Sequence, residues 1–413
     1  MIQDGRRSRP ASGSQAQPTV PVLLFTRLSG ILSHGTLGAM RSLGRLGVPV
    51  YWSVPEPLPA AAYSRYAAGI FNCEEAASGE EVVAHLEEIR RELGARPILV
   101  PTDDVAARFV EEQAAALRRS FVFPEQPPGL PARLVDKRQM YELCLELGVP
   151  TPQTRFFSSR EELVSIADSS SYPVVFKGID TTLAGQETGF RMVIASDRDQ
   201  LLRAHAALDD EREPRFMVQD YIPGSAQTTW MFNGYFDADS ECRLGVCGRK
   251  LRQSPPYTGA TSLGECVENP AIRDTTVSLM KRLGYRGILD IGYRFDRRDG
   301  QYKLLDANPR LGASFRLFVD SNGLDVIRSL YSDLSGGSPP RPGSTVAGRK
   351  WLVETSDAAS AIVYRRDGLL STRAWLGSLR GIEETAWMAA DDVKPGIRHY
   401  GVASRKLARL LKG

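Results

Sequence analysis

Residues 284–317 read GYRGILDIGYRFDRRDGQYKLLDANPRLGASFRL, and this stretch is the most informative part of the chain about its fold. Two strand-like runs, Ile288–Phe295 and Tyr302–Ala307, flank the polar turn 296–300, which ends in glycine. This pattern predicts a β-hairpin. The second run continues into DANPR at 306–310. The hairpin therefore carries an acid, an amide and an arginine to its end.

The DANPR residues have the chemistry of a metal and phosphate site. Asp306 and Asn308 lie two residues apart on a strand and therefore point to the same side. Their oxygens are hard ligands suited to Mg²⁺, and the guanidinium of Arg310 suits phosphate oxygens. Asp290, on the partner strand, offers a second carboxylate across the ladder. The alternative, that Asp306 and Asn308 only shape a turn, is about equally supported by these residues alone.

Two features upstream also suit an anionic ligand. Lys177 ends the apolar run 173–176, where a buried ammonium requires a counter-charge such as phosphate. The alternative is a lysine that extends along the strand end to solvent. The loop 181–189 bears hydroxyls and glycines and suits closure over phosphates, although an ordinary hairpin loop fits as well.

Two further stretches lie between this loop and the hairpin. MVQDYIPG at 217–224 ends a strand-like run at a Pro-Gly turn, where backbone groups can meet the edge of an adenine. An edge strand that runs into a turn is the alternative. RKLR at 249–252 carries three cations. Strand alternation predicts that Lys250 and Arg252 share one face and form an anion site, with a solvated face as the competing interpretation.

The chain divides into segments of different character. The first part alternates strands such as Val22–Phe25 with helices, which predicts a doubly wound parallel sheet. The glycines at 30–38 do not match the dinucleotide fingerprint, which disfavours an NAD-dependent enzyme. We expect these segments: a disordered leader 1–19, an α/β domain 20–131, an α+β domain 132–337 and, after a Gly/Pro/Ser linker, a carboxy-terminal extension 345–413.

Composition excludes several classes of protein. The chain has 413 residues, 42% of them hydrophobic and 24% charged, with a net charge of +3, which is ordinary globular composition without a basic excess. We expect no nucleic-acid partner and no membrane association. The five scattered cysteines and only four histidines disfavour a disulfide framework, a zinc ribbon and a Ser-His-Asp triad. This cysteine usage favours a cytoplasmic location.

The order of these features is more specific than any one of them. Lys137, Lys177, the glycine loop, VQDYIPG, the cationic strand, Asp290 and DANPR follow one another as in the ATP-grasp superfamily. Over roughly residues 20–340 the chain resembles ATP-dependent carboxylate–amine ligases, the group that includes D-aspartate ligases and relatives of carbamoyl-phosphate synthetase. The resemblance implies an ATP-grasp fold with an amino-terminal doubly wound domain and a small carboxy-terminal segment.

The resemblance also implies roles for individual residues. Two lysines would contact the ATP phosphates, two glycines would lie in the covering loop, and one segment would hold the adenine and ribose. In that order these residues are Lys137 and Lys177, Gly185 and Gly189, and Gln219, Asp220, Tyr221, Ile222 and Gln227. The Mg²⁺ ligands would be Asp290, Asp306 and Asn308, and the catalytic cations would be Arg310, Lys250 and Arg252.

One position departs from the family pattern. Many relatives have the first metal carboxylate two residues after the position of Asp290, and here that residue is Gly292. Asp290 is on the same face, so it would have to reach the metal through a bulge or a water. A milder departure is Asp306, where glutamate is common.

The implied reaction is amide formation with ATP and Mg²⁺, or Mn²⁺, through an acyl phosphate. The partners would be a small carboxylate and an amine, such as amino acids or a peptide. A homodimer is the assembly favoured on general grounds, because it is the commonest symmetric one. Two rivals remain open. An ATP-grasp phosphotransferase would release no free phosphate, and a nucleotide-binding protein without catalysis is the interpretation that Gly292 favours.

Overall fold

The amino-terminal domain is a parallel sheet covered by helices on both faces, as predicted. The computed structural model of the chain describes residues 19–30, 32–179, 192–208, 216–337 and 340–410. The strand order is β3-β2-β1-β4. Leu24 on β1 packs with Leu37 of one helix, whereas Phe25 packs with Leu86 of another. The elements are β1 (Val22–Phe25), α1 (His34–Gly44), β2 (Val50–Val54), η1 (Ala60–Tyr63), β3 (Ala67–Asn72), α2 (Gly79–Leu93), β4 (Ile98–Pro101), α3 (Asp104–Glu112) and α4 (Ala114–Leu117).

A small antiparallel sheet forms the next unit, in the order β5-β8-β6-β7. Phe176 and Val218 of this sheet pack against Leu163 and Leu201 of two covering helices. Before it, Asp136 caps a helix through the backbone N–H of Gln139 (2.8 Å), as predicted. The elements are α5 (Leu130–Val135), α6 (Lys137–Leu147), β5 (Thr154–Phe156), α7 (Arg160–Ser169), β6 (Val174–Gly178), β7 (Met192–Ala195), α9 (Arg198–Ala206) and β8 (Phe216–Asp220).

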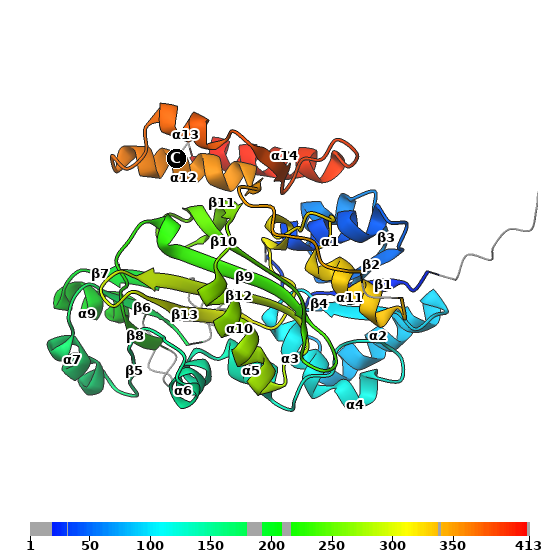
Figure 1. The fold of residues 1–413 in the computed structure, drawn as a ribbon, viewed down its shortest axis with the longest axis horizontal. Helices are drawn as coiled ribbons and strands as arrows, with labels where there is room; N and C mark the ends of the chain where they lie inside the picture. Colours follow the sequence, from blue (N-terminus) through cyan, green and yellow to red (C-terminus); the bar gives the residue numbers. More distant parts are fainter. Residues whose placement is uncertain (1–18, 31, 180–191, 209–215, 338–339, 411–413) are drawn as a thin grey trace, which may run out of the picture.

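A seven-stranded sheet forms the centre of the molecule, in the order β13-β12-β9-β10-β11-β14-β15 (Figure 1). Successive residues of a strand point to opposite faces of the sheet. Here apolar side chains lie on both faces. Phe232 and Ile291 face α10, whereas Met231 and Ile288 face the amino-terminal domain and α11. The elements are η2 (Ala226–Thr228), β9 (Thr229–Phe236), β10 (Cys242–Ser254), β11 (Ala260–Cys266), α10 (Pro270–Leu283), β12 (Gly287–Asp296), β13 (Gln301–Asn308), η3 (Phe315–Leu317) and α11 (Val326–Leu334).

The carboxy-terminal extension adds two strands to this sheet and then a layer of helices above β11 and α1 (Figure 1). β14 pairs with β11, and β15 pairs with β14. In the described part of the chain, no helix is both long and apolar enough to cross a membrane. The elements are β14 (Lys350–Leu352), α12 (Glu354–Arg366), α13 (Thr372–Ser378), β15 (Ile382–Thr385) and α14 (Lys394–Leu410).

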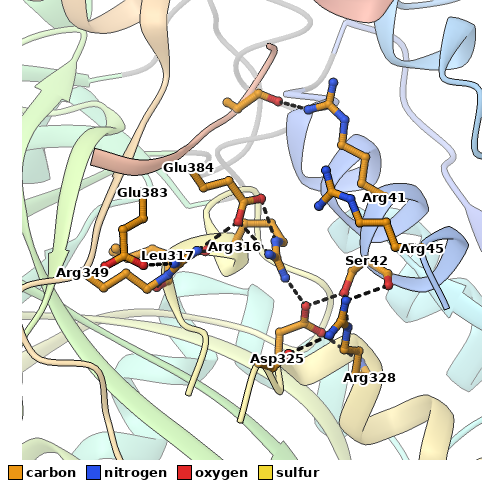
Figure 2. A network of polar contacts seen from close by, with 12 residues as sticks. Arg41, Ser42, Arg45, Arg316, Leu317, Asp325, Arg328, Arg349, Glu383 and Glu384 are labelled. Atoms are coloured by element: carbon orange, nitrogen blue, oxygen red, sulfur yellow. Dashed lines mark hydrogen bonds and ion pairs between the residues drawn. The ribbon is translucent and has the colours of Figure 1, made fainter. Parts of the chain in front are cut away.

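A buried polar network joins this extension to the amino-terminal domain (Figure 2). Arg316, after the hairpin, binds Glu384 of β15 through Nε at 2.8 Å and also pairs with Asp325. Asp325 accepts a hydrogen bond from Ser42 of α1 at 2.6 Å. Arg41 of α1 pairs with Asp392 at 2.9 Å, with both side chains at most 3% exposed. The three parts of the chain therefore pack as one body.

Candidate functional site

The candidate site lies at the polar end of one face of the seven-stranded sheet. In the β12–β13 ladder, Asp290 pairs with Asn308 and Gly292 pairs with Asp306. Because side chains alternate, these four residues share one face. The amide nitrogen of Asn308 donates to the backbone oxygen of Asp290 (3.1 Å) and to Oδ2 of Asp306 (3.3 Å). The hairpin therefore brings together the three residues that we predicted as metal ligands.

The two carboxyl groups differ in their electrostatic surroundings. Burial raises the pKa of Asp290 to about 6, against the opposing effect of Arg310. Burial also disfavours the charged form of Asp306, but Lys137 and Lys250 together hold the pKa of Asp306 below its usual value. Asp306 is therefore the firmly ionised member of the pair.

Three lysines from three separate elements converge on Asp306. Lys177 on β6 and Lys137 at the start of α6 are at most 8% exposed, and Lys250 on β10 is half-buried. Burial and the neighbouring Lys137 lower the pKa of Lys177 to about 8, against the attraction of Asp306. Because these buried ammonium groups repel one another, an anionic ligand between them would be stabilising.

Arg310 is fixed by the amino-terminal domain. Its Nε donates to Asp104 at 2.9 Å, and one terminal nitrogen lies 3.7 Å from Asp290. Asp104 is the first residue of α3, whose cap is the buried Asp103. The guanidinium keeps its charge, because the effect of burial is outweighed by Asp104 and Asp290, which raise its pKa. Arg310 thus connects the end of the hairpin to the start of α3.

The prediction that Lys250 and Arg252 share a face is wrong. Lys250 pairs with Gly264 and Arg252 pairs with Leu263, so Leu251 is the extra residue of a β-bulge. The bulge reverses the alternation and turns Arg252 to the opposite side. There its guanidinium forms two hydrogen bonds with Asp357 of α12, at 2.7 and 2.8 Å. Arg252 therefore binds the carboxy-terminal extension.

The segment that we predicted to hold the adenine follows β8. Gln219 is buried, and its amide donates to Thr154 at 2.8 Å. Asp220 pairs with Arg155 at 3.0 Å. Both side chains therefore have partners within the small sheet.

The residues after Gln219 and Asp220 approach the hairpin more closely. The guanidinium of Arg294, on β12, lies 5.3 Å from the centre of the Tyr221 ring and donates to Gly224 at 2.8 Å. Ile222 is 2% exposed, whereas Gln227 in η2 is exposed. Tyr221 and Arg294 thus connect the small sheet to the large one. Gly185 and Gly189, which we predicted in the covering loop, lie outside the described residues.

Sequence reasoning missed three polar side chains on the same face of the sheet. Asn233 and Thr229 on β9 and Arg294 on β12 are at most 8% exposed. Among the described residues, both amide atoms of Asn233, Oγ1 of Thr229 and Nε of Arg294 have no hydrogen-bond partner. The available signal was polar residues at the inward positions of an otherwise apolar strand.

The donor set fits Mg²⁺ better than a soft metal. Within the described ranges, no three His, Cys, Asp or Glu side chains are arranged to hold a metal. The candidate set is instead two carboxylates and an amide, which are the hard oxygens that Mg²⁺ takes together with waters and phosphate. Asn308 donates through its nitrogen, which leaves its oxygen for a cation.

Comparisons with curated proteins find relatives that match part of this chain. No protein-family model matches the chain. D-aspartate ligase from Enterococcus faecium is 27% identical over 253 residues, which cover 57% of this chain and 58% of that protein. The N-terminal section of the carbamoyl phosphate synthase large chain from Methanopyrus kandleri is 25% identical over 202 residues, which cover 48% and 35%. The chain thus spans less than two thirds of the length of these relatives.

Solved structures resemble the chain over a longer stretch. L-amino acid ligase from Bacillus licheniformis has a TM-score of 0.58 at 15% identity, covering 77% of this chain and 75% of that one. Biotin carboxylase from Campylobacter jejuni has a TM-score of 0.59 at 17% identity, covering 79% and 74%. N5-carboxyaminoimidazole synthetase from Staphylococcus aureus, solved with ADP, has a TM-score of 0.60 at 11% identity, covering 80% and 81%. These similarities show the fold that the chain shares with them.

Proposed function

We propose, on the premise that this chain has the ATP-grasp fold of these relatives, that it is an ATP-dependent ligase that joins a carboxylate to an amine. The observation that carries the proposal is the convergence of Lys137, Lys177 and Lys250 on the carboxylate of Asp306. A polyphosphate that carries a divalent cation suits both sets of charges, because the lysines bind phosphate oxygens and the carboxylates bind the cation.

Each part of the site has a role in this proposal. Lys137 and Lys177 bind phosphate oxygens, and the adenine lies near Tyr221 and Ile222. Asp290, Asp306 and Asn308 would hold Mg²⁺, or Mn²⁺, which when bound neutralises charge on the phosphates. Arg310, held by Asp104, lies beside the phosphate that is transferred.

The reaction has two steps that need no covalent nucleophile of the protein. The substrate carboxylate attacks the γ-phosphorus of ATP, which gives an acyl phosphate and ADP. The amine then attacks the acyl carbon, the C–O bond breaks, and inorganic phosphate leaves. The protein contributes positioning and charge neutralisation. Lys250 faces the acidic pair from β10 and holds the reacting carboxylate, whereas Arg252 pairs with Asp357 of α12 and has no role in this proposal.

The names of two relatives favour amino acids as substrates, since one is a D-aspartate ligase and the other an L-amino acid ligase. We include in the proposal a small-molecule carboxylate and an amine of this class. A homodimer is also part of it, and light scattering on the purified chain tests that assembly.

The deciding experiment is ATP turnover with Mg²⁺ against a pool of amino acids and small carboxylic acids, with hydroxylamine as the amine. Stoichiometric ADP, phosphate and hydroxamate would support the acyl-phosphate route and identify the carboxylate. ADP with a phosphorylated acceptor and no free phosphate would instead identify a phosphotransferase. ATP binding without turnover across the pool would favour the nucleotide-binding alternative that Gly292 suggests.

A further inference from the structure

The turn between β10 and β11 is closed tightly at Gly259. Its backbone N–H donates to the backbone oxygen of Pro255 at 2.9 Å. A Cβ atom at position 259 would lie 2.1 Å from the carbonyl carbon of Ser254, so no larger residue fits there. The turn 255–259 is therefore compact, and the direction of the Gly259 carbonyl is set by the whole turn.

That carbonyl holds Lys250 of the candidate site. Nζ of Lys250 donates to the Gly259 oxygen at 3.1 Å, and the side-chain amide of Gln253 donates to the same atom at 2.9 Å. Lys250 lies on the face of β10 that it shares with the acidic hairpin pair, because Gly248, Met231 and Gly292 are aligned across β10, β9 and β12. The position of the turn thus sets the position of this ammonium group.

The opposite side of the turn is held by α12. The hydroxyl of Tyr257 donates to Asp367, the residue that follows α12, at 2.7 Å. The backbone N–H of Tyr257 donates to the hydroxyl of Tyr364 at 3.2 Å, and the two rings meet edge to face with centroids 5.3 Å apart. Tyr257 has φ +71°, a conformation that non-glycine residues rarely adopt without support from their surroundings.

α12 is itself anchored to β10 and β11, the two strands that this turn connects. Asp357 is 1% exposed and accepts hydrogen bonds from Arg252, from Ser262 (3.1 Å) and from the indole of Trp375 (3.0 Å). A carboxylate with this many donors fixes the helix in place. The β-bulge at Leu251 makes the arrangement possible, because it lets Lys250 face the site while Arg252 faces α12.

We propose that α12 of the carboxy-terminal extension is a positioning element for Lys250, acting through Tyr364, Tyr257 and the Gly259 carbonyl. The proposal rests on the proposed function in one respect, since it takes Lys250 to hold the reacting carboxylate. Tyr257 and Tyr364 are positioning residues because they act on Lys250 through the turn that carries the Gly259 carbonyl. Misplacement of a positioned group by about 1 Å can reduce turnover by about 100-fold.

The first test is independent of any activity. The full chain is treated with an amine-reactive acylating reagent, and the rate of modification of Lys250 is followed by peptide mass spectrometry. In Tyr257→Phe and Tyr364→Phe we expect Lys250 to react at least three-fold faster than in the wild type. Tyr400→Phe is the matched control, because it also removes a hydroxyl that donates to a carboxylate of the extension, Glu354. Equal rates in all four proteins would overturn the proposal.

The second test uses turnover. If the tyrosines act through Lys250, Tyr257→Phe lowers kcat several-fold in the wild-type background and has no further effect in Lys250→Met. An equal loss in both backgrounds would overturn the proposal. Should Tyr364→Phe fail to fold, Tyr257→Phe still decides, since its hydroxyl is exposed. If no substrate turns over, the ligase proposal fails while the labelling rates still test the positioning.

Discussion

Gly292 lies directly opposite Asp306 in the β12–β13 ladder, and a Cβ atom at position 292 would come within 2.5 Å of Oδ1 of Asp306. That distance is far shorter than a van der Waals contact. Asp290 also lies close to a glycine, since a Cβ atom at Gly312, beyond the end of β13, would lie 2.6 Å from its carboxyl carbon. Each carboxylate of the pair therefore lies against a glycine, and Gly292 provides the space that Asp306 occupies.

Placing an acid at position 292 should therefore harm the site. In Gly292→Ala and Gly292→Asp the new Cβ displaces the Asp306 carboxylate. We expect the Mg²⁺ concentration for half-maximal ATP turnover to rise by about 10-fold or more, which is the effect of changing a residue that orients a metal ligand. Gly79→Ala is the control, because a Cβ there meets only ordinary contacts at 3.9 Å or more. Higher turnover in Gly292→Asp would show that this glycine weakens the metal site.

Arg310 should matter more for turnover than for nucleotide binding. Arg310→Ala removes a cation that is positioned at the acidic pair by Asp104. We expect kcat to fall by about 100-fold or more, with the Kd for ATP changed by less than about three-fold. Asp104→Asn should lower kcat in the same direction but by less, since the guanidinium remains. Unchanged nucleotide binding together with unchanged turnover in Arg310→Ala would refute this role.

ATP affinity should decline in alkaline solution. The pKa of Lys177 is about 8, lowered by burial and by Lys137. A bound phosphate raises that pKa, so above pH 8 binding must take up a proton, and affinity falls by up to about 10-fold per pH unit until the pKa of the complex is reached. Titrations of ATP from pH 7 to 9.5 measure this slope. In Lys177→Met, binding is weaker and the part of the slope due to Lys177 is lost; an equal slope in both proteins would contradict the assignment.

Arg252 should contribute to stability. Asp357→Ala leaves its guanidinium buried and unpaired, which costs about 3–5 kcal/mol in the free energy of unfolding. The double variant Arg252→Met with Asp357→Leu removes both charges and should recover most of that loss. Denaturant unfolding measures both effects. A stable double variant that lowers ATP turnover by the same factor in a Lys250→Met background would restore Arg252 to the catalytic residues, because that loss could not arise through Lys250.

Acidification should loosen the contact between α1 and the extension. His34 is 5% exposed and lies near Trp351 and Trp387, with ring centroids 5.6 and 6.0 Å away. Burial, with a smaller effect of His399, lowers its pKa from 6.5 to about 4.

Between these pH values the unfolded chain binds a proton at His34 that the native protein does not. Stability is therefore fully present above pH 6.5 and declines as the pH falls toward 4, by at most about 3 kcal/mol. Thermal unfolding at pH 7.5, 5.5 and 4.5 measures the decline, and His34→Gln should show a shallower one. The same pH dependence in both proteins would exclude His34 as its source.

Much of the fold follows from local patterns in the sequence. The alternation in 288–295 and 302–307 predicts the hairpin that the structure has as β12 and β13, because side-chain burial and strand geometry have the same period of two. Asp136 and Gly148 mark the ends of α6, since capping depends only on nearby backbone groups. β14 and β15 were not predicted, because they are short and form only against β11.

The sequence by itself determined that Asp290, Asp306 and Asn308 lie on one face of a hairpin, since two-residue alternation is a local property of strands. Only the tertiary structure decided which cations meet them. Lys137, Lys177 and Lys250 converge because three elements pack around one point, and Arg252 turns away because one extra residue in β10 reverses its face. Convergence and register depend on contacts between distant parts of the chain, and no local pattern encodes them.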